Sequence, residues 1–419
     1  MLHTRYLVVG ASHAGLEAVT AIRHWDADGA LTMLSREAHQ PYSPTILPYV
    51  VSGRSKPERV ALKDAAWFAE RAVDLRCGEE VVSIDTENSV ARTASGTEWR
   101  YERLLLATGA APAIPPVEGL KDVRFHVLRT LDDALALRDA GARAKTVVVL
   151  GAGLVGLHAA EVLAKAGKQV VVVERHAHAL PGYLDAPAAE IVETAFRERG
   201  IVLMVGRTVA SVQGKGADPA TVTLDNGETL PAELLLVGTG VKPVTGFLDG
   251  SGIAVGQGIL VDDSMRTSAP GVWAAGDVAQ ARAFFGASSI VNGILPDAVE
   301  QGRIAGMAMA GDPALKPYAG GLPINTFPFF GRHAVSVGIS GEDDPGVEIH
   351  RHLDAKAGLY SRIALKDGRL IGVCTAGMPI DAGVMWQLIS RRVDLAPVKD
   401  EFVLAPLDTG RTLMSRLWR

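Results

Sequence analysis

The chain has 419 residues, of which 48% are hydrophobic and 21% charged, a balance typical of a soluble globular protein with two or three domains. The formal net charge of −5 argues against nucleic-acid binding. No apolar run reaches the roughly 18 residues of a membrane span, and no signal-peptide pattern leads the chain, so we expect no membrane partner and a cytoplasmic location.

The first predicted elements form a βαβ unit. Residues 6–10 (YLVVG) predict a strand, residues 14–24 a helix and residues 31–35 a second strand. The turn between the first strand and the helix reads GASHAG over residues 10–15, where Ser12 replaces the middle glycine of a G-x-G-x-x-G motif. A small residue at this position still allows a pyrophosphate to approach the backbone.

The residues Arg36 and Glu37, directly after the second strand, support the interpretation as a dinucleotide-binding unit. Glu37 stands where an acidic residue binds ribose hydroxyls in dinucleotide-binding units. The adjacent Arg36 would stack on adenine or contact a phosphate. A proline-rich segment, residues 40–48, is expected to be a loop.

A second βαβ unit follows about 140 residues later. Residues 146–150 and 169–174 predict strands, and residues 157–166 predict the helix between them. The turn over residues 151–156 is GAGLVG, a full match to G-x-G-x-x-G, and Glu174 ends the second strand. The glycines permit a tight turn, close approach of a pyrophosphate and close packing of helix on strand. The two units together predict two dinucleotide-binding domains.

The last hundred residues have a different pattern. Short alternating segments predict an antiparallel sheet followed by a helix over residues 383–390, so we expect an α+β domain. The expected strands are residues 334–338, 348–353, 361–366 and 369–373, with a hairpin turn at residues 366–368. Aromatic residues in this domain would form either a partner surface or ordinary core, and they are Phe327, Phe329, Phe330 and Trp386.

Cysteine usage bears on the redox chemistry. Cys77 and Cys374 are far apart and form no C-x-x-C pair, zinc pattern or cluster-binding run. We therefore expect no metal site and no iron–sulfur centre on this chain, and both thiols are interpreted as ordinary buried or surface groups.

Five motifs, in order and spacing, resemble those of the glutathione-reductase-like superfamily of flavoproteins with two dinucleotide-binding domains. They are GASHAG at residues 10–15, ATG at 107–109, GAGLVG at 151–156, VGTG at 237–240 with Pro243, and TSAPGVWAAGD at 267–277. The resemblance covers residues 1 to about 310. It implies an α/β fold with two Rossmann-like domains, the first binding FAD and the second NAD(H).

The resemblance also implies domain boundaries and site residues. Residues 1–112 and 241–315 would form the FAD-binding domain, residues 113–240 the NAD(H)-binding domain, and residues 316–419 a C-terminal α+β interface domain. The residues expected at FAD are Gly10, Ser12, His13, Ala14, Gly15, Arg36, Glu37, Thr45, Val81, Ala107, Thr108, Gly109, Gly276, Asp277, Leu295 and Pro296. Those expected at NAD(H) are Gly151, Gly153, Leu154, Val155, Gly156, Glu174, Arg175, Gly238 and Gly240.

Individual roles follow from the same resemblance. Asp277 would bind the ribityl chain of FAD, and the backbone of Val81 would contact adenine. The helix that begins near Pro296 would direct its N-terminus toward the flavin, where the helix dipole stabilises negative charge. Glu174 would repel a 2′-phosphate and favour NAD, although Arg175, His176 and His178 follow it and could bind such a phosphate.

The sequence departs from the family pattern at two positions. Thr45 stands where disulfide reductases of the superfamily carry a reactive cysteine, so flavin–thiol chemistry is not expected. His158 replaces a glutamate that lies near the nicotinamide, and it is interpreted either as a proton carrier or as polar packing. Thr45 and His158 are the only candidates for a catalytic role, because hydride transfer between the cofactors requires no acid or base.

These features indicate an NAD(P)H-dependent FAD oxidoreductase that exchanges hydride with NAD(H) and single electrons with an iron–sulfur partner in a hetero-oligomeric complex. The chain is similar to flavoprotein subunits of nitrite reductase, rubredoxin reductase, phenylglyoxylate dehydrogenase and tungsten aldehyde oxidoreductase complexes. The alternatives are a free-standing rubredoxin or ferredoxin reductase, an NADH oxidase, and a signalling protein in which FAD is mainly structural.

Overall fold

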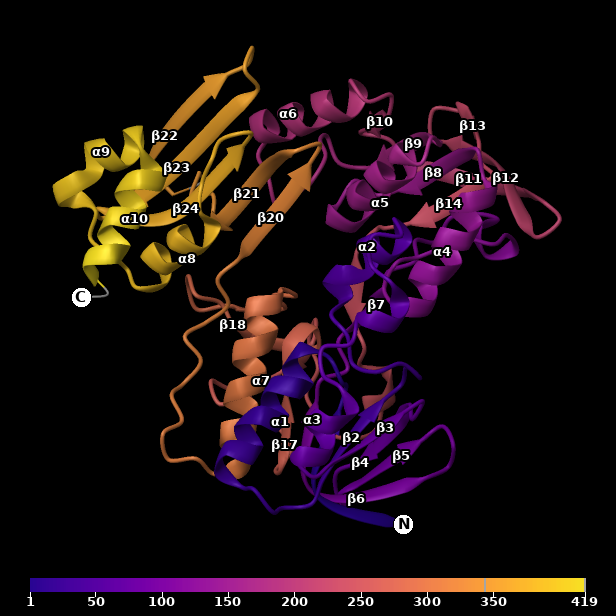
Figure 1. Cartoon of the computed structure of the whole chain (residues 1–419), viewed down its shortest axis with the longest axis vertical. Helices are drawn as coiled ribbons and strands as arrows, with labels where there is room; N and C mark the ends of the chain where they lie inside the picture. Colours follow the sequence, from indigo (N-terminus) through magenta and orange to yellow (C-terminus); the bar gives the residue numbers. More distant parts are fainter. Residues whose placement is uncertain (343, 418–419) are drawn as a thin grey trace. The chain divides into compact units, whose positions relative to one another are not determined.

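The structure is a computed structural model that describes residues 1–342 and 344–417. Contacts within the chain divide it into two compact units. Unit 1 comprises Met1–Pro112, Arg129–Asp132 and Val241–Gly321, and unit 2 comprises Ala113–Leu128, Asp133–Gly240 and the chain from Leu322 onward. Each unit contains a parallel sheet with flanking helices (Figure 1), which confirms the α/β class predicted from the sequence.

Unit 1 is built on a seven-stranded sheet in the order β3-β2-β1-β6-β5-β4, with β17 also paired to β6. The strands β3, β2, β1, β6 and β17 are parallel, and β4 and β5 add antiparallel pairs at one edge. The strands are β1 (Leu2–Val9), β2 (Leu31–Ser35), β3 (Val73–Cys77), β4 (Val81–Asp85), β5 (Val90–Thr93), β6 (Glu98–Leu106) and β17 (Val272–Ala274).

Shorter elements complete unit 1. The helices are α1 (His13–Trp25), α2 (Leu47–Val51), α3 (Ala65–Glu70) and α7 (Leu295–Ala310). The short strands are β7 (Ala110–Pro112), β15 (Val241–Pro243), β16 (Ile259–Leu260), β18 (Ala279–Arg282) and β19 (Ser289–Ile290). β7 ends the first long segment of unit 1, and β15 begins its last long segment. The two strands pair, so the chain leaves unit 1 and returns to it at adjacent positions.

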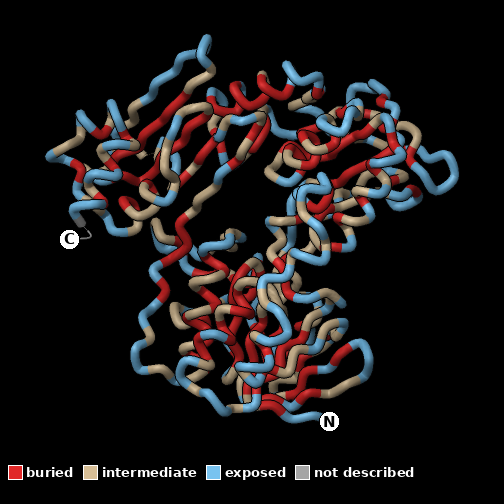
Figure 2. Tube along the Cα trace, viewed as in Figure 1, coloured by how far each residue is buried: buried red, intermediate tan, exposed pale blue. Residues whose placement is uncertain are grey.

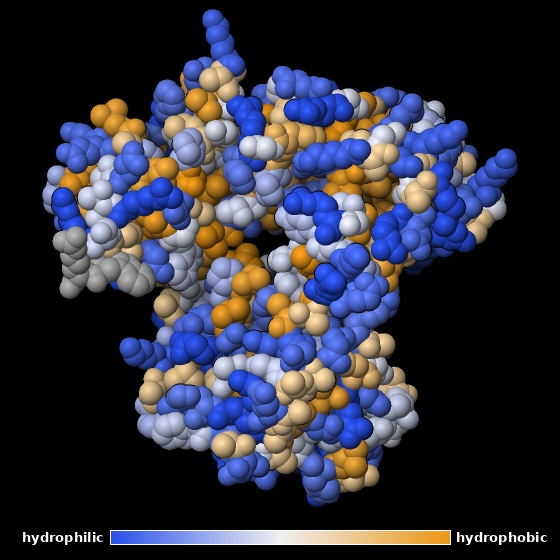
Figure 3. Space-filling view, in the orientation of Figure 1, coloured by the Kyte–Doolittle hydropathy of each residue, from blue (hydrophilic) through white to orange (hydrophobic). Residues whose placement is uncertain are grey.

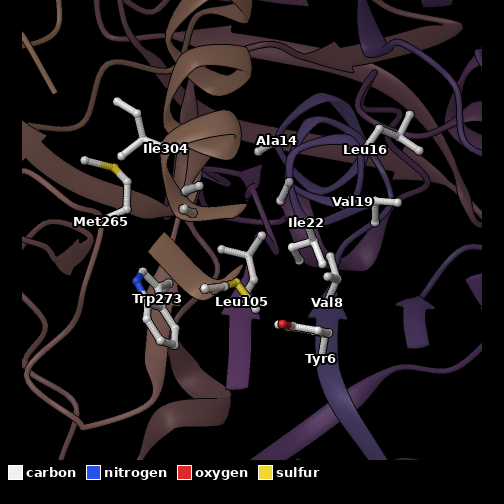
Figure 4. Close-up of a cluster of buried hydrophobic side chains, with 14 of the residues drawn as sticks. Tyr6, Val8, Ala14, Leu16, Val19, Ile22, Leu105, Met265, Trp273 and Ile304 are labelled. Atoms are coloured by element: carbon white, nitrogen blue, oxygen red, sulfur yellow. The ribbon is translucent and has the colours of Figure 1, made fainter. Parts of the chain in front are cut away.

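The core of unit 1 lies between the parallel strands and the helix pair α1 and α7. Side chains of Val8 on β1, Leu105 on β6 and Trp273 on β17 pack with Ile22 of α1 and Ile304 of α7 (Figure 4). The C-terminal parts of β1 (YLVV) and β6 (LLL) are continuous apolar runs and buried, as expected where helices cover a parallel sheet.

The parallel sheet of unit 2 has the order β10-β9-β8-β14. Its strands are β8 (Thr146–Leu150), β9 (Gln169–Glu174), β10 (Val202–Val205) and β14 (Leu234–Val237), and a separate antiparallel sheet contains β11 (Val209–Lys215), β12 (Asp218–Leu224) and β13 (Thr229–Pro231). The helices in this part of the chain are α4 (Leu131–Arg143), α5 (Leu154–Lys165) and α6 (Ala186–Arg197).

A five-stranded antiparallel sheet in the order β20-β21-β24-β23-β22 forms the rest of unit 2. Its strands are β20 (Ile324–Phe329), β21 (Arg332–Gly338), β22 (Val347–Asp354), β23 (Leu359–Lys366) and β24 (Arg369–Ala376), followed by α8 (Ala382–Ser390), α9 (Lys399–Leu404) and α10 (Pro406–Leu417). The expected hairpin turn is confirmed, because Asp367 and Gly368 connect β23 to β24 with φ angles of 50° and 71°.

Helix α6 packs against both β10 and the strands β23 and β24, so it connects the parallel sheet of unit 2 to the five-stranded antiparallel sheet. Its N-cap residue Asp185 accepts a hydrogen bond from the backbone of Ala188. The same carboxylate accepts one from the hydroxyl of Tyr360 at 2.6 Å and lies 3.5 Å from the buried guanidinium of Arg362. A capping residue of the helix therefore also anchors the antiparallel sheet.

The structure corrects one interpretation of the sequence and decides another that was left open. The proline-rich segment expected to be a loop is helical from Pro44, because a 3₁₀ turn leads directly into α2 and its prolines occupy first-turn positions. Phe327 and Phe329 are 2% and 1% exposed, so these two aromatic side chains are core and not a partner surface. Phe330 and Trp386 are half-buried.

Buried residues follow the strands and helices of each unit, whereas the connecting loops are exposed (Figure 2). Hydrophilic and apolar side chains are interspersed on the face drawn in Figure 3. Among the helices that the structure describes, none combines the length and apolar character needed to cross a bilayer.

The contact between α1 and α7 gives a test of the fold. A methyl group at Gly302 would collide with the backbone carbonyl of Ala14, whereas one at the exposed Gly246 would meet no atom within 4 Å. We expect Gly302→Ala to lower the free energy of unfolding by about 1–3 kcal/mol in a urea titration, because helices forced apart lose packing. Gly246→Ala is the control. Equal stability of the two variants would contradict the described packing.

Candidate functional site

One elongated pocket in unit 1 collects residues from many separate segments of the chain. Expected FAD-site residues that line it are Gly10, Ser12, His13, Ala14, Arg36, Glu37, Thr45, Val81, Ala107, Thr108, Gly109, Gly276, Asp277 and Leu295. Gly15 and Pro296 do not line the pocket: Gly15 is buried beneath the turn, and Pro296 is exposed in the first turn of α7.

The glycine turn of unit 1 brings the N-terminus of α1 to this pocket. Gly10 has a φ of 113°, and a side chain there would collide with the carbonyl of Ala107 at the end of β6. A side chain on Gly15 would collide with the carbonyl of Gly10. The turn therefore lies against β6, and α1 begins at His13 with its free backbone N–H groups at the pocket, a position suited to a pyrophosphate.

The acidic residue that follows β2 is held by a tyrosine. The hydroxyl of Tyr42 donates to Oε2 of Glu37 at 2.5 Å and accepts a hydrogen bond from the backbone N–H of Leu131 at 2.7 Å. Glu37 also lines the pocket, so its carboxylate combines an anchored position with access to ribose hydroxyls.

Asp277 forms an ion pair that the sequence did not reveal. Its Oδ2 accepts a hydrogen bond from Arg129 at 2.8 Å, and both side chains are only about one-quarter exposed. Arg129 and Thr130 belong to the short segment of unit 1 between residues 129 and 132, and both line the pocket. An arginine at this place adds a positive charge suited to phosphate oxygens beside the expected ribityl contact.

A chain of hydrogen bonds connects the turn to the proline-rich segment. Nε2 of His13 lies 2.8 Å from Oγ of Ser43, which lies 2.8 Å from Oγ1 of Thr45. Burial lowers the pKa of His13 against the opposing effects of Glu17 and Asp277, so the imidazole favours its neutral form. Among the described residues that line the pocket there is no cysteine. Thr45 therefore contributes a hydroxyl where a thiol relay would need sulfur.

Several pocket residues had no recognisable signal in the sequence. They come from the residues before β4, from the segment after β15, and from the turn before α7 and the first turn of that helix. They include Glu80, Val244, Phe247, Gly293 and Ala298. Only the tertiary fold brings these segments together. The helix N-terminus, the anchored carboxylate and the Arg129–Asp277 pair along one elongated pocket fit the pyrophosphate, ribose and ribityl groups of FAD.

The glycine turn of unit 2 repeats the geometry of unit 1. Gly151 has a φ of 99°, and a side chain there would contact the carbonyl of Gly238 at the end of β14. A side chain on Gly156 would collide with the carbonyl of Gly151, whereas one on Gly153 would meet no protein atom within 4 Å. The space beside Gly153 is therefore open on the protein side, as the predicted approach of a dinucleotide pyrophosphate requires.

The other residues expected at NAD(H) surround this turn. α5 begins with Leu154 and Val155, three residues earlier than the sequence predicted, and Val155 is 42% exposed. Arg175 is exposed directly after β9, and Gly240 follows β14 with a φ of 101°.

Hydrogen bonds within the protein hold both carboxylate oxygens of Glu174, the residue expected to bind ribose hydroxyls. It is 5% exposed, and its Oε2 accepts a hydrogen bond from the backbone N–H of Ala152 inside the glycine turn at 2.8 Å. Its Oε1 accepts one from the backbone of His176 at 2.9 Å and lies 2.6 Å from Nδ1 of the same residue. The carboxylate is therefore fixed beside the turn, and its discrimination against a 2′-phosphate stays a prediction.

His158 lies on α5 and packs against the core. Its ring centroid is 4.8 Å from that of Phe327, and burial lowers its pKa despite the opposing charge of Glu161. This aromatic contact supports the packing interpretation, and a role as proton carrier remains a prediction.

Comparison with known proteins gives a consistent set of relatives. A family model described as pyridine nucleotide-disulphide oxidoreductase matches residues 4–305. The chain is 53% identical over 418 residues to the NADH-dependent phenylglyoxylate dehydrogenase subunit epsilon of Aromatoleum evansii, covering 100% of this chain and 99% of that protein. It is 30% identical over 390 residues to the biphenyl dioxygenase system ferredoxin–NAD(+) reductase component of Paraburkholderia xenovorans, covering 93% and 94% of the two chains.

Solved structures agree with this result. The ferredoxin reductase for the CYP199A2 system from Rhodopseudomonas palustris has a TM-score of 0.81 and 28% sequence identity to this chain, covering 89% of this chain and 91% of that one.

The empty space beside Gly153 leads to a direct test. We expect Gly153→Val to weaken NADH binding by roughly tenfold or more, about 1.4 kcal/mol, with little change in melting temperature, because the added Cβ meets no protein atom within 4 Å and occupies the space expected for the pyrophosphate. Gly156→Val is the matched control and should destabilise the protein, because its side chain collides with the Gly151 carbonyl. Fluorescence titration and thermal melts separate the two effects. Unchanged NADH affinity in the first variant would contradict the assignment.

Proposed function

The chain belongs to the pyridine nucleotide-disulphide oxidoreductase family, and we propose that it is the flavoprotein subunit of a larger dehydrogenase, passing electrons between NAD(H) and an iron–sulfur partner. The family and the relatives establish an NAD(P)H-dependent oxidoreductase that uses FAD and NAD(H). The relative from Aromatoleum evansii is itself a subunit of an NADH-dependent dehydrogenase, and it matches this chain over its full length.

The observation that carries the proposal is Thr45 in the unit 1 pocket. Its hydroxyl is hydrogen-bonded to Ser43, and the two cysteines of the chain are not among the residues that line the pocket. Cys77 donates to the backbone of His39, and the buried Cys374 has its pKa raised to about 12, chiefly by burial. With no thiol in the pocket, electrons have no internal disulfide to reduce and leave for an external acceptor.

Each unit contains one glycine turn, so we place one cofactor in each unit. We assign FAD to the unit 1 pocket and NAD(H) to the turn at residues 151–156, with the antiparallel sheet of β20–β24 as the interface domain for a partner. When bound, the flavin accepts hydride from the nicotinamide and can release electrons one at a time. The chain contributes the orientation of both cofactors through its helix N-termini and anchored carboxylates.

A free-standing ferredoxin reductase is the second candidate. It is favoured by the 30% identity to a ferredoxin–NAD(+) reductase component and by the likeness to a solved ferredoxin reductase. The two candidates share the same chemistry and differ in whether the electron acceptor is a permanent subunit.

Co-purification distinguishes these candidates. We expect the tagged chain, purified from its native source under anaerobic conditions, to bring iron-containing subunits in fixed proportion, because a subunit interface persists through chromatography. Iron analysis and mass spectrometry of the eluted complex give the measurement. A yellow protein that elutes alone and reduces an added ferredoxin with NADH would favour the free-standing reductase and overturn the complex.

Nucleotide preference follows from Glu174. We expect the flavin to be reduced by NADH at least roughly tenfold faster than by NADPH at equal low concentrations, because the fixed carboxylate repels a 2′-phosphate. The Glu174→Gln variant removes the charge, keeps an acceptor for Ala152 and should narrow the ratio. Stopped-flow absorbance at the flavin band measures both rates. A preference for NADPH in the unmodified protein would contradict this role of Glu174.

A further inference from the structure

A buried carboxyl group lies directly behind the lining of the unit 1 pocket. Asp297 is in the first turn of α7, flanked by the pocket residues Leu295 and Ala298, but it is itself only 4% exposed. A side chain on Gly321 would lie 2.8 Å from its Oδ2, so the backbone of Gly321 covers the carboxyl group.

Hydrogen bonds connect Asp297 to the pocket wall. Nδ2 of Asn292 donates to its Oδ2 at 2.6 Å, and the hydroxyl of Tyr318 also hydrogen-bonds to it. The hydroxyl of Tyr318 accepts from Nε2 of Gln301 at 3.3 Å, and Oε1 of Gln301 accepts from the backbone N–H of Gly276 at 2.9 Å. Gly276 lines the pocket, so two side chains link the buried carboxyl group to a pocket residue.

The charges around Asp297 leave its anionic form without a cationic partner. In the described part of the chain, no arginine, lysine or histidine lies within salt-bridge distance of it. The titratable groups that act on it are Tyr318, from the segment after α7, and Glu300, from the next turn of α7. Burial raises the pKa of Asp297 to about 6, with a smaller effect of Glu300 in the same direction, although hydrogen bonds from Tyr318 and Asn292 oppose it.

We propose that the buried carboxylate of Asp297 takes up a proton when the flavin in the unit 1 pocket is reduced. Asp297 does not itself line the pocket and acts through its hydrogen-bonded neighbours, and the inference rests on the proposed place of FAD. Hydride from NADH brings two electrons and one proton to the flavin, which leaves one net negative charge in the pocket. An unprotonated Asp297 would repel that charge. A proton from solvent then binds the carboxylate, forming an O–H bond, and restores the charge of the site without any further electron.

Two features make Asp297 suited to this role. It is at the N-terminal turn of a sixteen-residue helix, whose dipole favours one negative charge there but not two. Asp297 is connected through Tyr318 and Gln301 to the backbone of Gly276, the neighbour of Asp277. A change in the protonation of Asp297 can therefore alter the hydrogen bonds at the pocket without a movement of the helix.

Proton uptake on reduction is the decisive measurement. The holoenzyme is mixed anaerobically with NADH at pH 7 in weak buffer with a pH indicator. We expect the unmodified protein to take up close to one proton more per flavin reduced than the Asp297→Asn variant. Asp312→Asn, which removes a carboxylate at the opposite end of α7, is the control and should match the unmodified protein. Equal uptake in all three proteins would overturn the proposal.

A second measurement needs no loaded enzyme. Because the folded pKa of Asp297 is raised to about 6 from an ordinary value near 3.8, its contribution to stability is fully present below pH 4 and is lost as the pH rises through 6. The melting temperature of the apoprotein should therefore rise in Asp297→Asn relative to the unmodified protein at pH 8 but not at pH 4. A constant difference across this range would also overturn the proposal.

The outcomes separate this inference from the proposed function. A purified protein without FAD, or one whose flavin NADH cannot reduce, would end the proposed function and with it the premise. A flavin that NADH reduces normally, with the same proton uptake in Asp297→Asn, would reject only the role of Asp297. If the variant fails to fold, the reduction potential of the unmodified protein decides: its dependence on pH should steepen above about pH 6, and an unbroken slope from pH 5 to 8 would reject the role.

Discussion

The contact between a glycine turn and the neighbouring strand organises both units. In unit 1 the backbone of Gly10 lies against the carbonyl of Ala107, and in unit 2 Gly151 lies against Gly238. A side chain at either position would force the glycine turn away from the end of the neighbouring strand. Because the contact holds, each helix begins directly above the carboxyl ends of the parallel strands, and its unpaired N–H groups face outward where a phosphate can reach them. The remaining site residues take their positions from this geometry.

The features that the sequence predicted correctly are local ones. Strands such as β1 and β8 and helix α1 follow from apolar runs and periodicity within a few residues, and both glycine turns follow from a six-residue pattern. Arg129 and Tyr42 escaped prediction because their roles depend on partners distant in sequence: Asp277 for the first, and Glu37 with the Leu131 backbone for the second. The helical character of the segment from Pro44 was missed because proline reads as a loop signal unless its place in the first turn is known.

Charge distribution connects the site to its chemistry. The unit 1 pocket brings together a helix N-terminus, the cation of Arg129 and the carboxylates of Glu37 and Asp277, so that groups of both signs line it. The histidine nearest the turn, His13, favours its neutral form because it is buried.

The path of the backbone has a consequence for engineering. The chain passes from one unit to the other at residues 112–113, 128–129, 132–133, 240–241 and 321–322. Neither unit therefore corresponds to a single stretch of gene. A truncation at any of the first four junctions removes β17 from the sheet of unit 1, together with the pocket residues that follow residue 241. A swap of coenzyme specificity or of electron acceptor by recombination would need to exchange several segments at once. Point substitution is the more practical route to a redesigned reductase on this scaffold.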